Sequence, residues 1–487
     1  MFPQKLLSKA IIFLILNSFV SAFDTAPHFD LTRSVLHERG FNESAIKTVQ
    51  VENWLTDYYS STPTTSKNNR ANLEKLHFDN LFTTKEVENY WSWFLNNLKI
   101  ATQKAAKNDD SLAMLTIIGI SLHATQDFYS HSNWVETHPR FSDGAFQTAT
   151  FLSSVSIENL LTGKYPADSK MGFDGKEVPQ AAKIHGDYLQ GINHDSPIRP
   201  NWAEAYVFAY CASHELIEQL RKWADETRPG FWQKVQQFQV NQADSKDLEY
   251  DLRAVRNISM WVKGKGADGH WKGDKSGLVK FFDTFTPKWI ASKNSIFVKQ
   301  MSEGDLPNQI SQNLYTSNPA PKLPLIDRFS LKKRALFLRT TLVKETDDVT
   351  LLERKIDSGG KADFYPKITI DGQIYTDRVL QDFAEFEDPW LEIHFVDDSA
   401  SEIPIKIAIF DEDDIDADGF YKDDICDINP KAGKSEIDFR FNLKDSSLTG
   451  DINGIFQTEI NPFTTSGAKP DKNRALLKAY LTQFPLR

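Results

Sequence analysis

The hydrophobic positions of this 487-residue chain follow two different periods, one before and one after about residue 310. In the first part, apolar residues recur at intervals of three and four, which is the period of a helix with one buried face. The segments that show this period are 87–106, 112–134, 203–224 and 252–261. The first part is therefore predicted to be mostly α-helical.

The second part of the chain has a period of two. A polar stretch rich in Asn and Pro is followed by short segments in which apolar and polar residues alternate, as they do in half-buried strands. These segments are 335–342, 367–374, 390–395, 403–410 and 437–443, and Gly, Asp and Pro separate them. We expect a helical domain over 23–310, a linker over 311–330 and an antiparallel β-sandwich over 331–487.

The N-terminal residues have the features of a secretory signal peptide. Lys5 and Lys9 precede an apolar run over 10–16, and Val20-Ser21-Ala22 is a cleavage site of small residues. The run is much shorter than the ~20 residues that a membrane span needs. We therefore expect residues 1–22 to be removed, Phe23 to be the mature terminus and the protein to be secreted.

The charge balance narrows the possible partners. The chain has 56 Lys and Arg against 67 Asp and Glu, a formal net charge of −11. Because broad binding to a phosphate backbone requires clustered basic residues, this balance argues against a nucleic-acid partner. An acidic protein can still reach an anionic surface when bound cations reverse its local charge.

Candidate metal ligands are concentrated in the helical part. His123, Asp127 and His131 are four residues apart, and at ~100° per residue they share one face of a helix. Imidazole and carboxylate are ligands that zinc accepts, although a hydrogen-bonded polar stripe without metal has the same pattern. Further candidates along the helical part are His28, Asp57, His77 and His185.

The order of these residues resembles a known family. His28, Asp57, His77 and then His123-x-x-x-Asp127 are similar to the ligands of the zinc-dependent phospholipase C and single-strand nuclease family, an all-helical fold. QDFYSHSNWVE at 126–136 and GINHDS at 191–196 most resemble the branch that joins Pseudomonas fluorescens phospholipase C with the fungal heterokaryon-incompatibility C proteins. The resemblance covers about residues 23–225 and implies two or three zinc ions.

The zinc ligands that the resemblance implies are Phe23, through its terminal amine and carbonyl, His28, Asp57, His77, His123, Asp127, His131 and His185. Two departures stand out. Asn133 replaces the family's next histidine, so His131 is assigned in its place. The family's last His-x-x-x-Asp or Glu pair is also missing near 200–205. His185, His194 or the pair His214 and Glu218 could substitute for it, and we favour His185.

The resemblance implies hydrolysis of a phosphodiester. Zinc acidifies a bound water and neutralises charge on a phosphoryl group, and Asp57 is the candidate that orients the water and accepts its proton. The expected substrate is a glycerophospholipid, which would give diacylglycerol and a phosphorylated head group. Alternatives are a nuclease-type phosphodiesterase and a non-catalytic lipid-binding or interaction protein of the same fold.

Acidic residues cluster in two segments of the β part. Asp357 and Asp363 lie in IDSGGKADFYPKITIDG at 356–372, and Asp411, Asp413 and Asp423 lie in IAIFDEDDIDADGFYKDDICD at 407–427. Such carboxylates repel one another unless a hard cation such as calcium binds them. A solvated acidic loop and an isolated EF-hand-like loop are the alternatives, and Asp424 could exchange with Asp423.

Taken together, the two acidic segments resemble the calcium-dependent lipid-binding C2 domain of protein kinase C and synaptotagmin, over about residues 331–450. The resemblance implies that the five aspartates bind calcium and that the β part docks on a phospholipid membrane. This expectation favours lipid over nucleic acid as the substrate. We expect the protein to act as a monomer.

Overall fold

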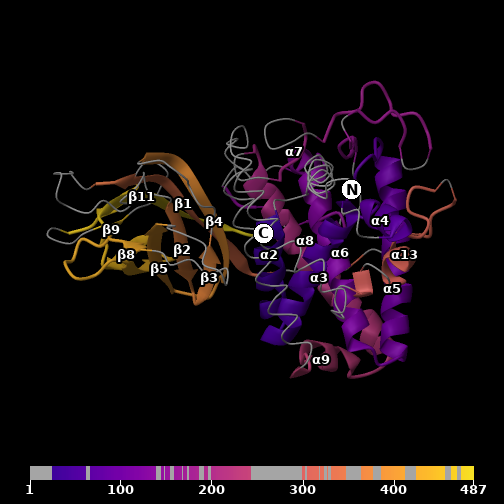
Figure 1. The fold of residues 1–487 in the computed structure, drawn as a ribbon, viewed down its shortest axis with the longest axis horizontal. Coiled ribbons are helices and arrows are strands. Elements are labelled where there is room, and N and C mark those ends of the chain that lie inside the picture. The colour runs from indigo at the N-terminus through magenta and orange to yellow at the C-terminus, as the bar shows by residue number, and fades with distance from the viewer. Residues whose placement is uncertain are drawn as a thin grey trace, which may run out of the picture. The chain divides into compact units, whose positions relative to one another are not determined.

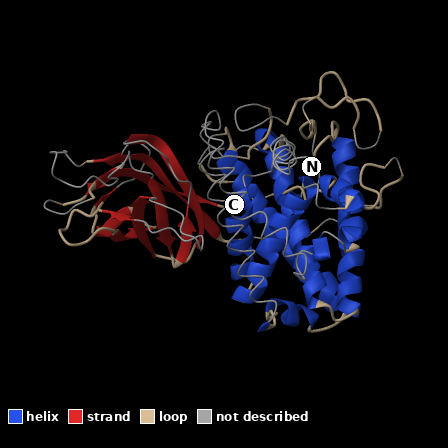
Figure 2. Cartoon of the chain, in the orientation of Figure 1, coloured by secondary structure: helices blue, strands red, loops and turns tan. Residues whose placement is uncertain are grey.

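The computed structural model describes residues 25–61, 66–138, 144–146, 149–153, 158–166, 168–172, 175–185, 191–195, 199–242, 299–301, 304–316, 318–322, 326, 331–346, 364–376, 385–411, 424–455, 462–468 and 473–487. The expected signal peptide and Phe23 lie outside these residues. Helices make up one compact unit and strands another (Figure 2), which confirms the predicted fold class. None of the described helices is long and apolar enough to cross a membrane.

The described part of the helical unit contains helices α2 (Thr25–Glu38), α3 (Glu43–Ser61), α4 (Lys67–Glu74), α5 (Thr84–Lys107), α6 (Ser111–His131), α7 (Trp134–Thr137), α8 (Trp202–Thr227), α9 (Phe231–Gln236) and α13 (Leu306–Ser311) (Figure 1). Three of the four predicted helical segments correspond to α5, α6 and α8. The fourth, 252–261, lies outside the described residues.

Helix α6 contacts α3, α5 and α8, and its side chains are buried from Met114 to His131. This burial explains why its sequence is apolar on nearly every side. Asp110 caps the helix by accepting a hydrogen bond from the Ala113 N–H at 2.9 Å. The helix was predicted to continue to residue 134, but it ends at His131 because Ser132 turns to extended backbone and pairs with Thr162.

Residues of the expected linker pack onto the helical unit. The Asn97 side chain on α5 donates hydrogen bonds to the Gln312 carbonyl in this segment at 2.5 Å and to the carbonyl of Ile310, just before it, at 3.0 Å. The Tyr315 hydroxyl donates to the Asp79 carbonyl at 2.7 Å. The Asn and Pro content predicted a linker without fixed contacts. These side-chain hydrogen bonds instead hold the described residues of the segment against the helices.

The β unit contains β1 (Lys333–Glu345), β2 (Phe364–Ile370), β3 (Gln373–Thr376), β4 (Glu385–Asp397), β5 (Glu402–Asp411), β6 (Asp424–Cys426), β7 (Ile437–Asn442), β8 (Ser447–Gly450), β9 (Gly454–Ile455), β10 (Phe463–Ser466) and β11 (Ala475–Pro485). One sheet has the order β10-β11-β1-β4. The other has the order β3-β2-β5-β7-β8-β9, with β6 paired to β5. All these pairs are antiparallel, and Phe337 of β1, for example, lies between Thr482 and Ile393.

Each predicted alternating segment contains strand residues, with one difference in detail. The segment 367–374 was expected to be one strand, but it divides into β2 and β3 at Asp371-Gly372. These two residues have φ of 49° and 81°, the left-handed backbone that a tight hairpin turn requires and that Asp-Gly accepts readily. The inner faces of the sheets share one core that includes Leu338, Ile405 and Phe439.

The β unit also takes in a short segment from the first part of the chain. Phe146 packs its ring against Phe337 and Phe484, with ring centroids 5.9 and 5.7 Å away. Its N–H donates to the Pro485 carbonyl, and its carbonyl accepts from the Arg487 N–H, both at 3.0 Å. The predicted boundary implied that the β unit is a single stretch of sequence over 331–487. The β unit instead also includes residues 140–147.

Candidate metal centre

The first of two polar clusters in the helical unit is built around Asp127 of α6. Asp127 Oδ1 lies 3.0 Å from His28 Nε2 of α2. Its other oxygen, Oδ2, lies 2.9 Å from His77 Nδ1, in the turn after α4, and 3.2 Å from His123 Nε2. Candidate ligand atoms of Asp57, from α3, His77 and His123 all lie within 4.8 Å of one another. We call these five residues the Asp127 cluster.

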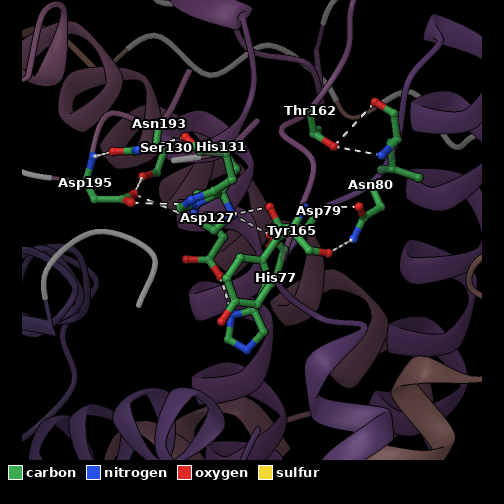
Figure 3. Close-up of polar contacts among 12 residues, drawn as sticks. His77, Asp79, Asn80, Asp127, Ser130, His131, Thr162, Tyr165, Asn193 and Asp195 are labelled. Atoms are coloured by element: carbon green, nitrogen blue, oxygen red, sulfur yellow. Dashed lines mark hydrogen bonds and ion pairs between the residues drawn. The ribbon is translucent and has the colours of Figure 1, made fainter. Parts of the chain in front are cut away.

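The second cluster joins the end of α6 to two loops (Figure 3). His131 Nδ1 lies 3.3 Å from Asp79 Oδ1, and His131 Nε2 lies 3.5 Å from Asp195 Oδ1. His185 Nε2 lies 3.6 Å from the other oxygen of Asp195. The Ser130 hydroxyl also donates a hydrogen bond to Asp195. We call Asp79, His131, His185 and Asp195 the His131 cluster.

A strained turn connects the two clusters. Phe78 and Asn80, on either side of Asp79, both have left-handed backbone, with φ of 54° and 63°. This conformation is uncommon for a bulky residue and costs about 1–2 kcal/mol. The Phe78 ring is fully buried and lies 4.0 Å from Tyr90 and 5.2 Å from Phe128, between ring centroids. This packing holds the turn, which gives His77 to one cluster and Asp79 to the other.

Second partners orient three of the histidines. His28 Nδ1 donates to Gln126 Oε1 at 2.6 Å, and His123 Nδ1 faces Asn53 Oδ1 at 3.3 Å. His131 Nδ1 lies 2.7 Å from the His77 carbonyl oxygen. An amide or carbonyl oxygen can only accept, so each of these contacts places the proton on Nδ1 and leaves the Nε2 lone pair pointing into the cluster. Metal-binding histidines are commonly oriented in this way.

Burial and the mixture of charges shift the pKa values in the Asp127 cluster. Burial lowers the pKa of His123 to about 3, despite the nearby Asp127 charge. Burial also raises the pKa of Asp57 to about 6. Burial would also raise the pKa of Asp127. The interactions with His123, His28 and His77 outweigh burial and hold the pKa of Asp127 well below the ordinary value. The cluster thus contains one firmly ionised carboxylate and one that titrates near neutral pH.

The His131 cluster has the opposite balance. Burial alone would lower the pKa of His131, but the charges of Asp79 and Asp195 raise it well above the ordinary value. The pKa of Asp195 is lowered, because His131 and His185 outweigh its burial. A cation at this position is therefore stabilised by two buried carboxylates. A divalent metal ion would compete with the His131 proton for the same place, so its affinity should fall as pH falls.

The residues present fit a zinc ion in each cluster. Two ligands bound to one tetrahedral zinc at ~2.0–2.1 Å stand about 3.3 Å apart, which is close to the spacings in both clusters. Within the described residues, His77 Nε2 and His131 Nε2 are buried and accept no hydrogen bond. Buried polar atoms without a partner are uncommon, and a metal ligand is one explanation for them.

Seven of the eight residues predicted to bind zinc lie in the two clusters: His28, Asp57, His77, His123 and Asp127 in the first, and His131 and His185 in the second. The eighth, Phe23, lies outside the described residues. Sequence reasoning missed Asp79 and Asp195. Asp79 follows His77 by two residues, and Asp195 lies in the GINHDS segment, so both were close to residues already selected.

The other candidates for the last ligand lie elsewhere. His194 Nε2 is 3.2 Å from Glu136 Oε1. The His214 ring accepts a hydrogen bond from Arg39 Nε at 2.9 Å, and Glu218 pairs with Arg221. None of these three pairings brings the residues into the two clusters.

The predicted calcium residues fall mostly outside the described chain. Asp357, Asp363, Asp413 and Asp423 are not among the described residues. Asp411 ends β5, where it is buried and lies opposite Asp424 of β6 in the strand register. The structure therefore places one of the five carboxylates, at the end of a strand from which the acidic segment continues.

The protein thus combines a helical unit that contains two buried groups of His and Asp side chains with a second, antiparallel β unit. Residues 33–156 match the family model of the VWA7 N-terminal domain. This match spans about a quarter of the chain and contains Asp57 and His77 as well as the candidate ligands on α6. Residues 33–156 are therefore similar to that domain. The similarity to zinc-dependent phospholipases C rests on the sequence motifs and stays a proposal. No curated protein sequence matches the chain.

Solved structures that match the chain include several C2 domains. A C2 domain of plant extended synaptotagmin 1 is 15% identical over 31% of this chain and 95% of its own, with a TM-score of 0.21. The two C2 domains of extended synaptotagmin 2 are 17% identical over 32% of this chain and 43% of theirs, with a TM-score of 0.20. Another C2 domain is 12% identical over 32% of this chain and 99% of its own, with a TM-score of 0.19. TM-scores this low carry no argument about function.

Proposed function

We propose that the helical unit binds two zinc ions in adjacent sites, one in each cluster, and hydrolyses a phosphodiester bond. The observation that carries the proposal is the convergence of His and Asp side chains from α2, α3, α6 and the intervening loops, at spacings suited to zinc. Neighbouring divalent ions in hydrolases typically face a phosphoryl group from two sides. Phosphodiester hydrolysis is the chemistry that such a centre serves best.

The side chains of the two clusters have distinct roles in this proposal. Zinc, when bound, acidifies a water and neutralises charge on the phosphoryl oxygens. Asp127 and the histidines around it would hold one ion, while Asp79, His131, His185 and Asp195 would hold the other. Asp57 lies at the edge of the first site and accepts the proton that the attacking water loses.

For the substrate we propose a glycerophospholipid at a membrane surface, cleaved by a secreted enzyme. This part rests on the sequence alone: the signal-peptide pattern, the resemblance of 126–136 and 191–196 to phospholipases, and the calcium-type aspartates of the β part. Calcium held by those aspartates would offset the net negative charge where the protein meets lipid head groups.

Zinc content and hydrolysis measured on the same preparations test the proposal. The wild-type protein should hold two zinc ions and release diacylglycerol from mixed phospholipids. Asp127→Asn should remove at least one zinc and lower hydrolysis on the order of a thousandfold, because an amide cannot balance the charge of the ion. His37→Ala changes an exposed histidine of α2 and should alter neither quantity. Full activity in zinc-free protein would disprove the proposal. Faster cleavage of single-stranded DNA than of lipid would show that the substrate is a nucleic acid and not a phospholipid.

A second function, a structural metal centre without catalysis, is favoured by one observation. His28, His123 and Asp127 have only 3%, 1% and 0% of their surfaces exposed. Structural zinc sites are closed in this way, whereas catalytic sites keep a position open to water and substrate. In that case chelation would lower the melting temperature, while neither lipid nor nucleic acid would be hydrolysed.

A further inference from the structure

Tyr165 is held at the edge of the candidate metal centre by its backbone. Its N–H donates to Asn80 Oδ1 at 3.1 Å, and its carbonyl accepts from Asn80 Nδ2 at 2.6 Å, as Figure 3 shows. The preceding residues are fixed as well. The Gly163 N–H donates to the His131 carbonyl at 3.0 Å, and the Lys164 carbonyl accepts from the His185 N–H at 2.9 Å. Residues 163–165 are thus tied to His131 and His185 of the His131 cluster and to Asn80, the residue after Asp79.

Close packing with this segment requires glycine at position 163. A Cβ atom there would lie 2.5 Å from the His185 Cα, closer than such atoms approach in proteins. The backbone of 163–165 therefore lies directly against the His185 segment. This contact brings the Tyr165 ring to 5.8 Å from the His185 ring, between centroids, in an edge-to-face arrangement.

The Tyr165 hydroxyl differs from the other hydroxyls near the centre. The Tyr90 hydroxyl donates to the Lys75 carbonyl at 2.6 Å, and the Tyr315 hydroxyl donates to the Asp79 carbonyl at 2.7 Å. Among the described residues, by contrast, the Tyr165 hydroxyl makes no hydrogen bond, and Tyr165 is only partly buried. The ordinary pKa of tyrosine is ~10, so this hydroxyl keeps its proton at neutral pH and can donate a hydrogen bond.

We propose that the Tyr165 hydroxyl donates a hydrogen bond to an oxygen of the phosphoryl group held at this centre. The inference rests on the proposed function, and it identifies Tyr165 as a substrate-contacting residue. A neutral donor suits this position because the surrounding side chains are otherwise carboxylates and histidines. The carboxylates Asp57 and Asp79 would repel an anionic phosphoryl group, whereas the hydroxyl can stabilise it.

Phosphate affinity and turnover of a Tyr165→Phe variant test the inference. The probe is inorganic phosphate, titrated by calorimetry into zinc-loaded protein, together with hydrolysis of a soluble aryl phosphodiester. Loss of one hydrogen bond to an anion should weaken phosphate binding about tenfold or more. The catalytic efficiency kcat/KM should fall at least as much. Zinc stoichiometry should be unchanged, because the hydroxyl is not proposed to bind metal.

Tyr90→Phe is the matched control, since it removes a hydroxyl that already donates to the Lys75 carbonyl. It should leave phosphate affinity unchanged. Unaltered phosphate affinity and turnover in Tyr165→Phe, with zinc still bound, would overturn the role of Tyr165 and leave the metal centre standing. Wild-type protein that binds no zinc would overturn both. Zinc-bound protein without turnover still supports the inference if phosphate affinity falls in Tyr165→Phe alone.

Discussion

At the scale of single residues, the surroundings of each histidine determine its chemistry. The histidines of the two clusters face carboxylates, whereas His394 of β4 is buried in the β unit with 7% of its surface exposed. Its Nδ1 lies 2.7 Å from the Tyr375 hydroxyl oxygen. Burial, and then the charge of Lys333, lower the pKa of His394 to about 3. This imidazole is therefore neutral in the folded protein over most of the acidic range.

His394 should make the stability of the β unit depend on pH. The unfolded chain takes up a proton below the ordinary pKa of ~6.5, whereas the folded chain does so only near 3. The contribution of His394 is thus complete above pH 6.5 and is lost as pH falls towards 3, by at most about 1.4 kcal/mol per pH unit. His394→Gln keeps a hydrogen-bonding side chain but cannot titrate.

Urea unfolding of the wild-type and His394→Gln proteins between pH 7 and pH 4 checks this prediction. The difference in unfolding free energy between them should shrink, or change sign in favour of the variant, as the pH is lowered. Histidines of the candidate metal centre titrate in both proteins, so their contributions to the pH dependence cancel in the comparison. A constant difference across this range would show that His394 is not kept neutral by the fold.

At the scale of secondary-structure elements, the contact between α3 and α6 determines whether the centre forms. Gly119 of α6 lies where a Cβ atom would approach the Glu52 Cβ to 2.6 Å and the Asn53 nitrogen to 2.9 Å. Asn53 in turn faces the His123 ring, and Asp57 lies one turn further along α3. The absence of a side chain at position 119 thus allows α3 to bring Asn53 and Asp57 to the candidate metal centre.

Gly119→Ala separates helix propensity from packing. Propensity alone predicts that alanine stabilises a helix by about 1 kcal/mol relative to glycine. The close approach of α3 predicts the opposite, a loss of about 1–3 kcal/mol, because a backbone has to move. We expect packing to prevail, with a lower melting temperature and weaker zinc binding. Lys99→Ala, at an exposed position of α5, should change neither by a measurable amount. A more stable Gly119→Ala protein would contradict the α3–α6 contact.

At the scale of the whole molecule, the proposed hydrolysis and the proposed membrane docking belong to separate compact units. Each unit has its own hydrophobic core, and the candidate zinc ligands and the candidate calcium ligands belong to different units. Changes in one unit should therefore affect the other only when both act on the same substrate surface. Effects at such separated sites are generally additive.

Vesicle binding tests this division. Calcium should promote sedimentation of the protein with vesicles of phosphatidylserine and phosphatidylcholine. Asp411→Asn should weaken this response on the order of tenfold, because calcium affinity depends on the number of charged ligands. Hydrolysis of a soluble short-chain substrate should stay the same. Glu402→Gln, an exposed carboxylate at the other end of β5, is the control. Calcium-independent binding in the wild-type protein would remove the proposed role of the aspartates.

The sequence by itself determined three of the long helices, several strands and the face of α6 that carries ligands. Periods of 3.6 and two are local properties, so α5, α6, α8 and strands β1, β2, β4, β5 and β7 could be recognised without knowing what they pack against. The spacing of His123, Asp127 and His131 likewise predicted one shared helical face. The turn at Asp371-Gly372 was missed because the apolar alternation continues across it.

Only the tertiary structure decided how those ligands divide between two clusters. Eight residues of helix rise about 12 Å, so His131 cannot share a single ion with His123, although both lie on one face. Asp79 and Asp195 complete the His131 cluster from loops far apart in the sequence, as does His185. No local period marks such residues, because their positions depend on the left-handed turn at 78–80 and on the backbone pairing of 163–165.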